Sequence, residues 1–435
     1  MMFRFLPLIA ALGSLAGGAA LALPPGSPAN VPSPAAGSEV HAALSSEPTF
    51  NRDIAPILYQ HCASCHHPGQ VAPFSLLTYG DAQKRAPLLA SVTASRQMPP
   101  WKAESHGEFV DENRLTDEEI ALIKHWADGG TKEGKRSDLP APPKFTTDWR
   151  MGEPDMVIGP PQPYTLSAEG RDEYHNFILP TNFPEDRYLA AIEVRPGNRT
   201  VVHHVVVSLD TNGTARKRAA GKMDFVGDTG LGFTALSTLS IWAPGNFPRR
   251  LAAGTGLLLP KGADIVLQVH YHRTGKVEVD DTKLGLYFCK EPVDKKMQDF
   301  LMPAFLLIPA GEANYETHSE ITVPTDETLR TIMPHMHLLG SAMTVTVTFP
   351  DGKERTLINV PHWDFDWQAT YTYKEPVKIP KGSKIKLVAH YDNSKDNPRN
   401  PFDPPRLVGW GEQTTNEMCI AFLGFTADDE HLLKR

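Results

Sequence analysis

The sequence predicts a multidomain protein in which a small all-α domain is followed by two all-β antiparallel sandwich domains of jelly-roll-like type. The chain has 435 residues, which at about 150 residues per domain is enough for two or three domains. Helical periodicity occurs over residues 47–136, whereas the chain after Phe145 consists of short β-branched runs between turns. The 39 prolines also fit short strands better than long helices.

The composition excludes several classes of protein. Hydrophobic residues make up 41% of the chain and charged residues 22%, which excludes a disordered or fibrous protein. The 43 basic and 51 acidic residues give a net charge of −8, which argues against nucleic acid as a partner. Four cysteines are too few for a disulfide scaffold. The 17 histidines are surface residues or metal ligands, and their spacing has to decide between the two.

The N-terminus reads as a secretory signal peptide over residues 1–22. Arg4 gives a positive start, residues 5–15 are apolar, and Ala20-Leu21-Ala22 is a cleavage site. Residues 23–46 form a flexible linker rich in Pro, Ala and Ser. We therefore expect bacterial export, a periplasmic or secreted location, and no membrane span in the mature form.

The first motif is Cys62-Ala63-Ser64-Cys65-His66, which has the C-x-x-C-H spacing of c-type haem attachment. Two thiols add to the haem vinyl groups, and the adjacent imidazole becomes an axial ligand of the iron. A thioredoxin-like redox pair or half of a zinc site is the alternative. Neither of these needs a histidine directly after the second cysteine, so we expect one covalently bound haem c.

A second haem iron ligand is expected downstream. Met98 precedes two prolines, and the segment resembles the small cytochromes c, in which a methionine held in this way completes the iron site. His67 and His106 are the rival ligands, and packing in the core is the other role open to Met98. The resemblance places a cytochrome c domain over residues 47–136.

Local signals support helices in this domain. A short helix is expected over residues 51–59, and residues 80–95 have helical periodicity. Thr116 and Glu119 form a capping box before an apolar stripe that ends at Gly129. A proline-rich linker over residues 137–148 follows.

The β region is expected to form two sandwiches, over residues 149–295 and 296–435. The first contains the pair His203-His204. Adjacent residues of a regular strand point to opposite faces, so this pair binds one metal only if the strand is distorted or its edge is open. In Gln268-Val269-His270-Tyr271-His272 the three polar residues share one face.

The second sandwich contains His335-Met336-His337, again with two imidazoles on one face of a strand, and the run Glu417-Met418-Cys419. A single H-x-H pair is as often a surface pair as a metal site. Met418 alone would be interpreted as a core residue.

The four signals, in this order, resemble the copper type II monooxygenases, the family of peptidylglycine α-hydroxylating monooxygenase and dopamine β-monooxygenase. The resemblance covers residues 149–425 and implies two eight-stranded sandwiches with two copper ions. It implies an electron-transfer copper held by His203, His204 and His270. It also implies a catalytic copper held by His335, His337 and Met418. The pattern selects His270 over His272, which becomes a neighbouring or surface residue.

The resemblance also implies an activity. Such an enzyme uses O2 and electrons to hydroxylate a C–H bond of a small molecule, and its two coppers face each other across a solvent gap. An external donor, either a reduced cytochrome or an ascorbate-like reductant, supplies the electrons. The haem fused to this chain is expected to relay them to the copper centres, first to the copper of His203, His204 and His270.

The sequence departs from the amidating members of the family where they hold a substrate carboxylate with Arg, Asn and Tyr. Here the corresponding residues are Met333, Ile420 and Phe422, which are apolar. Together with Gln268 they are expected around the copper ligands or in the substrate pocket. We therefore expect a rather apolar organic substrate in place of a glycine-extended peptide.

Other interpretations remain open. One alternative is an electron-transfer or copper-binding protein that holds haem and copper but has no hydroxylase activity. Another is a cytochrome fused to binding sandwiches whose histidine pairs are vestigial. Cys289 and Cys419 are either paired or free thiols. Asp364 and Asp366 are expected on the solvated face of a strand.

Overall fold

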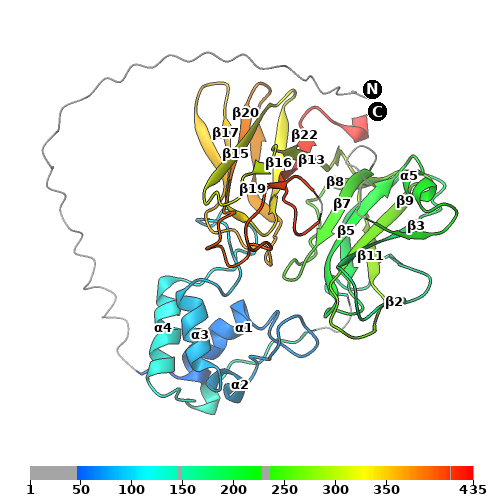
Figure 1. Cartoon of the computed structure of the whole chain (residues 1–435). Coiled ribbons are helices and arrows are strands. Elements are labelled where there is room, and N and C mark those ends of the chain that lie inside the picture. Colours follow the sequence, from blue (N-terminus) through cyan, green and yellow to red (C-terminus); the bar gives the residue numbers. More distant parts are fainter. Residues whose placement is uncertain (1–46, 146–148, 228–235, 412, 435) are drawn as a thin grey trace, which may run out of the picture. The chain divides into compact units, whose positions relative to one another are not determined.

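The structure, a computed structural model, describes residues 47–145, 149–227, 236–411 and 413–434, which belong to one compact unit. The expected signal peptide and the linker over residues 23–46 lie outside the described residues. Within the described ranges, no helix has both the length and the apolar character required to cross a bilayer. In Figure 1 the helices α1–α4 occupy the blue-to-cyan part of the chain, and strands dominate the green-to-red part.

The helical part differs from the sequence expectation in its details. The expected helix over residues 51–59 is a π-helical turn followed by α1, and the periodic segment 80–95 is divided into α2 and α3. Pro87 lies in the first turn of α3, where a missing N–H costs nothing, so the proline begins a new helix. The helical elements are η2 (Phe50–Ile54), α1 (Ala55–His61), α2 (Tyr79–Gln83), α3 (Ala86–Ala94), α4 (Asp117–Asp128) and η3 (Arg136–Asp138).

The last helix of this part, α4, begins as predicted. The Thr116 hydroxyl accepts a hydrogen bond from the Glu119 N–H, and the Glu119 carboxylate accepts one from the Thr116 N–H, which confirms the capping box. Ile123 and Trp126 are fully buried in one core with Cys62. The helix thus covers the segment that carries the C-x-x-C-H motif.

The first half of the β region contains two five-stranded sheets. Their strand orders are β1-β11-β4-β8-β12 and β6-β3-β9-β5-β7, and β10 pairs separately with β2. Buried Val, Leu and Ile side chains from both sheets pack together in one core. The elements are β1 (Met156–Ile158), β2 (Tyr164–Leu166), β3 (Glu173–Pro180), β4 (Arg187–Arg195), β5 (Val202–Asp210), α5 (Thr214–Arg218), β6 (Asp224–Val226), β7 (Leu236–Trp242), β8 (Thr255–Leu259), β9 (Asp264–Tyr271), β10 (Glu278–Asp280), β11 (Lys283–Phe288) and β12 (Lys295–Lys296).

The second half contains two four-stranded sheets, ordered β13-β22-β16-β19 and β15-β20-β17-β18, with a separate pair of β14 and β21. The pairing partners change after β12, which pairs with β8, whereas β13 pairs with β22. These sheets agree with a β-sandwich. The elements are β13 (Gln298–Pro303), β14 (Leu307–Ile308), β15 (Tyr315–Thr322), β16 (Glu327–Met336), β17 (Gly340–Thr348), β18 (Glu354–Val360), β19 (Tyr371–Ile379), β20 (Lys384–Tyr391), β21 (Val408–Gly409), β22 (Cys419–Ala427) and η4 (Leu432–Lys434).

The segment after Met98 belongs to the C-terminal sandwich by its packing, although it precedes α4 in the chain. Phe109 is 2% exposed and lies in the core of that sandwich. Its ring centroid is 5.1 Å from that of Tyr373, and the Val110 N–H donates to the Thr372 carbonyl at 2.8 Å. A buried aromatic side chain of this kind contributes about 1.5–3 kcal/mol to stability, so the segment is fixed on β19.

Candidate copper centres

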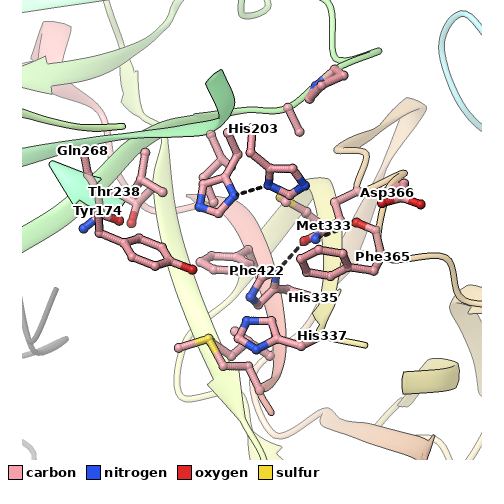
Figure 2. A pocket seen from close by; sticks show the side chains of 18 of the residues that line it. Tyr174, His203, Thr238, Gln268, Met333, His335, His337, Phe365, Asp366 and Phe422 are labelled. Carbon is pink, nitrogen blue, oxygen red and sulfur yellow. Dashed lines mark hydrogen bonds between the residues drawn. The ribbon is translucent and has the colours of Figure 1, made fainter. Parts of the chain in front are cut away.

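Two groups of histidines face one cavity of about 150 Å³. Figure 2 shows His203 on one side of this cavity, and His335 with His337 on the other. Met418 lines the same cavity. The structure therefore brings together residues of both ligand sets that the sequence pattern predicted.

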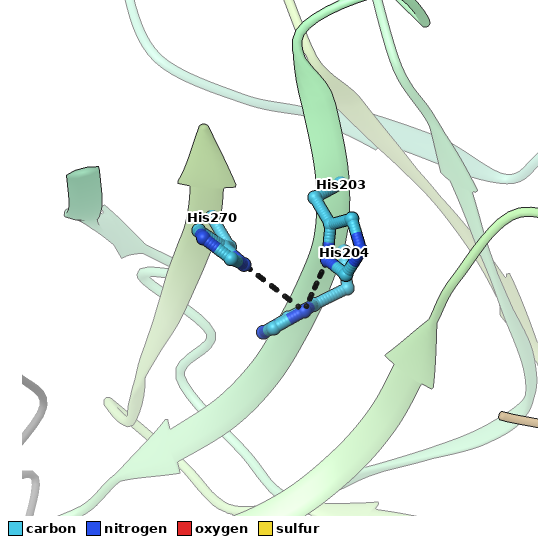
Figure 3. Close-up of side chains that lie close together, drawn as sticks. All are labelled: His203, His204 and His270. Atoms are coloured by element: carbon cyan, nitrogen blue, oxygen red, sulfur yellow. Dashed lines mark hydrogen bonds between the residues drawn. The ribbon is translucent and has the colours of Figure 1, made fainter. Parts of the chain in front are cut away.

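The pair His203-His204 lies where β5 is distorted. The register between β5 and β9 shifts between Val202 and His204, which is a β-bulge. A bulge re-aims side chains that would otherwise alternate between the two faces. The Nδ1 atoms of His203 and His204 consequently lie 3.2 Å apart (Figure 3). This is the strand distortion that a shared metal requires.

The third histidine of this set comes from the neighbouring strand. His270 on β9 lies opposite His204, and their Nδ1 atoms are 3.4 Å apart. One nitrogen of each of the three imidazoles lies within 4.8 Å of the others. His270 Nε2–H donates to the Asp172 carboxylate at 3.1 Å, which leaves Nδ1 free to bind a metal.

Burial favours the neutral, metal-binding form of two histidines of this set, His203 and His204. It lowers the pKa of His203 to about 4 and the pKa of His204 well below its usual value. Neutral imidazoles with facing nitrogens are suited to copper. His272, by contrast, has a side chain that is 64% exposed and that contacts Asp172 at 3.2 Å instead of joining the cluster.

The second set lies where β16 ends and β22 begins: His335 is on β16, His337 directly follows it, and Met418 directly precedes β22. His335 Nδ1–H donates to the Gln368 side-chain oxygen at 2.6 Å, and His337 Nδ1–H donates to the Asn416 carbonyl at 3.1 Å. Both bonds leave Nε2 free to bind a metal. Burial lowers the pKa of His335 to about 4 and that of His337 to about 3, so both imidazoles are neutral.

Glu417 fixes the position of Met418 relative to these histidines. Its buried carboxyl group accepts hydrogen bonds from the backbone N–H groups of His337 at 2.9 Å, Leu339 at 2.6 Å and Met418 at 3.3 Å. Burial raises the pKa of Glu417 to about 8. One side chain thus ties the chain after β16 to Met418, the residue directly before β22, which carries the thioether.

The residues that replace the carboxylate-binding set lie at the same cavity. Met333, Ile420 and Phe422 all line the cavity, and Met333 and Ile420 are 4% and 1% exposed. Gln268 also lines it and donates to the Asn176 side-chain oxygen at 3.1 Å. The cavity therefore has an apolar part made by Met333, Ile420 and Phe422, beside the polar side chains of Gln268, Gln368 and Asp366.

A comparison of the sequence with models of known protein families found one match in the region of the second ligand set. Residues 308–431 match the model of the family described as copper type II ascorbate-dependent monooxygenase, C-terminal domain. This range includes His335, His337 and Met418. The match indicates an oxidoreductase of the copper monooxygenase class. It supports the use of O2, a substrate and a reductant by this enzyme.

Other comparisons add little. A search of the curated proteins found no match. Among solved structures, one of the infectious bursal disease virus Gx strain shares 8% identity, with 64% of this chain and 73% of that chain covered and a TM-score of 0.19. The major capsid protein P2 of bacteriophage PM2 shares 7% identity over 63% of this chain and 99% of its own, with a TM-score of 0.24. Such scores carry no argument about the enzyme.

The residues predicted to hold a haem lie around a second, larger cavity. Cys62, Cys65, His66 and Met98 all line this cavity of about 1290 Å³. His66 Nδ1–H donates to the Phe74 carbonyl at 3.1 Å, which leaves Nε2 free as an iron ligand. Its rival His67 stacks on Phe145 at 3.8 Å between ring centroids.

The two cysteines outside the motif are separate thiols. Cys419 is buried in the core of the C-terminal sandwich, whereas the Cys289 thiol lies 3.6 Å from the Thr255 carbonyl of the N-terminal one. Burial raises the pKa of Cys419 to about 12 and also raises that of Cys289. Both are therefore protonated and unreactive at neutral pH.

Sequence reasoning missed the residues that orient the histidines. Asp172, Gln368 and Asn416 gave no local signal, because each meets its histidine from a distant part of the chain. The strand expected around Asp364 and Asp366 is wrong, because this segment is a loop between β18 and β19. The loop turns Gln368 toward His335 and places Asp366 at the cavity.

Replacing Asp172 with alanine should weaken copper binding at the His203–His204–His270 set by about 10- to 100-fold, because His270 loses its orienting acceptor. A competition titration with a copper chelator measures this affinity. His272→Ala is the matched control, since it removes the other partner of Asp172 and should leave the affinity unchanged. Equal weakening in both variants would contradict the orienting role.

Proposed function

We propose that this chain is an exported copper-dependent monooxygenase that hydroxylates a C–H bond of a small, rather apolar organic substrate. Electrons reach its copper centres from a covalently bound haem c. One observation carries the proposal: residues of both donor sets, His203 and His204 of the first and His335, His337 and Met418 of the second, line a single cavity of about 150 Å³.

The donor sets fit two copper ions. Three imidazole nitrogens suit the first site, and two imidazoles with the Met418 thioether suit the second, because a soft thioether favours Cu(I). Copper bound in these sites supplies one-electron redox chemistry and activation of O2. The residues around them fix the imidazole tautomers, through Asp172 for His270 and Gln368 for His335.

The cavity lining supports an apolar substrate. No lysine or arginine is among the described residues that line it, so a substrate carboxylate has no cation to pair with. Met333, Ile420, Phe422 and Ile241 give apolar contacts. Polar contacts come from the Ser208 and Thr238 hydroxyls, the Gln268 amide and the Asp366 carboxylate. A compound with an aliphatic or aromatic C–H and no negative charge suits this lining.

The haem proposal rests on the motif and on the shape of the larger cavity. Cys62 and Cys65 would attach the haem, while His66 Nε2 and Met98 would bind its iron. A haem bound there carries one electron at a time. The external donor would be a reduced cytochrome or an ascorbate-like reductant, and the periplasm or the cell exterior is the compartment proposed from the signal peptide.

The proposal is tested by metal analysis together with oxygen-isotope incorporation. The purified protein should contain two coppers and one iron per chain. With reductant and ¹⁸O2, it should add one ¹⁸O atom to a member of a panel of small uncharged aliphatic and aromatic compounds. His337→Ala should abolish this product. Iron without copper would overturn the proposal, and full copper content with peroxide as the sole product would favour a redox carrier.

A further inference from the structure

The loop over residues 361–370, between β18 and β19, contacts both histidines of the second ligand set. Near its start, the Trp363 indole N–H donates to the His337 carbonyl at 3.1 Å. Near its end, the Gln368 side-chain oxygen accepts a hydrogen bond from His335 at 2.6 Å. The position of this β18–β19 loop therefore decides where the two histidines are held.

The carboxylate of Asp364 organises the β18–β19 loop. It accepts a hydrogen bond from the Asp366 N–H at 3.3 Å. Two cations from other parts of the chain pair with it, Arg399 at 2.7 Å and Lys102 at 3.1 Å between nitrogen and oxygen. The side chains of Asp364 and Lys102 are only 14% and 13% exposed, so water and salt screen this pair much less than a surface pair. The pair is therefore a firm connection between two distant segments of the chain.

Lys102 belongs to the loop that carries Met98. Met98 lies four residues before it, and the Met98 N–H donates to the Val92 carbonyl of α3 at 3.0 Å. Trp101 packs edge-on against Tyr371, the first residue of β19, at 5.1 Å between ring centroids. The Met98 loop is thus held at one end by α3, and at the other end by the β18–β19 loop and the strand that follows it.

We propose that the ion pair of Lys102 with Asp364 is a positioning contact shared by two kinds of metal site. On one side it fixes the β18–β19 loop, and through this loop the imidazole of His335 and the backbone of His337. On the other side it fixes the loop that would present Met98 to the haem iron. Neither partner of the pair is among the described residues that line the two cavities, so both act through other side chains. This inference rests on the proposed function, because it requires bound copper and haem.

Lys102→Met tests this role, because methionine is also unbranched but carries no charge. In a His270→Ala background, which leaves only the His335–His337–Met418 set complete, copper(I) affinity should fall by about tenfold, the lower end of the range for residues that orient a metal ligand. A competition titration with a copper(I) chelator measures this affinity. In the same samples, the weak far-red absorption band of methionine-ligated ferric haem should decrease. Lys102→Arg keeps the cation and should restore both signals.

Lys353→Met is the matched control. Lys353 pairs with Asp351 at 2.8 Å in the same sandwich, but its side chain is 80% exposed, so loss of this cation should leave both signals unchanged. If Lys102→Met changes only one signal, or if Lys102→Arg restores neither, the shared positioning role is wrong. Asp364→Asn keeps the size of its side chain and removes the charge. It should weaken both signals as well, and it replaces Lys102→Met in the test if that variant does not fold.

Failure of this inference is distinguishable from failure of the proposed function. A parent protein that lacks copper or covalent haem overturns the proposed function. A parent protein that holds both metals, with full copper affinity and an unchanged haem band in Lys102→Met, overturns only the role of the ion pair.

Discussion

Replacing Met418 with leucine should remove the Cu–S component from the copper X-ray absorption spectrum and lower O2-dependent turnover by about 100-fold or more. Leucine keeps the volume of the side chain, so the loss reflects the missing thioether rather than a cavity. Met418 is 6% exposed, and its backbone N–H is held by Glu417. The backbone position should therefore survive the substitution.

Met343→Leu is the matched control for this experiment. Met343 is a fully buried methionine of β17 in the core of the same sandwich, and it does not line the copper cavity. Its replacement should cost less than about 1.5 kcal/mol and leave both the spectrum and turnover unchanged. A spectrum of the parent protein without a Cu–S component would refute the role assigned to Met418.

Replacing His66 with alanine should slow turnover driven by a reduced protein donor by about 100-fold, and should spare turnover in which a small reductant reduces copper directly. The reason is that His66 is the residue whose free Nε2 faces the larger cavity as an iron ligand. Met98→Leu should act in the same direction. The measurement compares O2 consumption with the two kinds of reductant.

The neighbouring His67 provides the control. His67 is buried against Phe145, and it is not among the residues that line the larger cavity. His67→Ala should therefore leave both assays unchanged. If His66→Ala loses activity equally with both reductants, the relay is wrong and the residue acts only through folding.

The residues proposed as copper ligands could be selected from the sequence because they lie in short motifs. Side chains alternate along β9 and β16, which places His270 and His335 on defined faces, and local sequence carries this information. The bulge that turns His203 and His204 toward one point depends on the pairing of β5 with β9. No signal within residues 201–207 specifies it.

The parts that were not predictable are contacts over long sequence separations. Asp172 meets a histidine 98 residues away, and Asn416 one 79 residues away. Phe109 lies within the expected cytochrome segment, yet its side chain fills the core of the C-terminal sandwich. A pattern read along the chain cannot reveal that a loop of one domain completes the core of another.

The bulge in β5 consists of one extra residue relative to β9, and this residue determines where the two adjacent imidazoles point. Deleting a single residue before His204 would let β5 run in uniform register with β9, and the strand would lose an irregularity that folding does not require. The same deletion would turn one of the two adjacent imidazoles to the opposite face, away from His270. Removal of this residue would thus give a more regular sheet and an incomplete histidine cluster, so one extra residue in β5 decides whether the three imidazoles can meet.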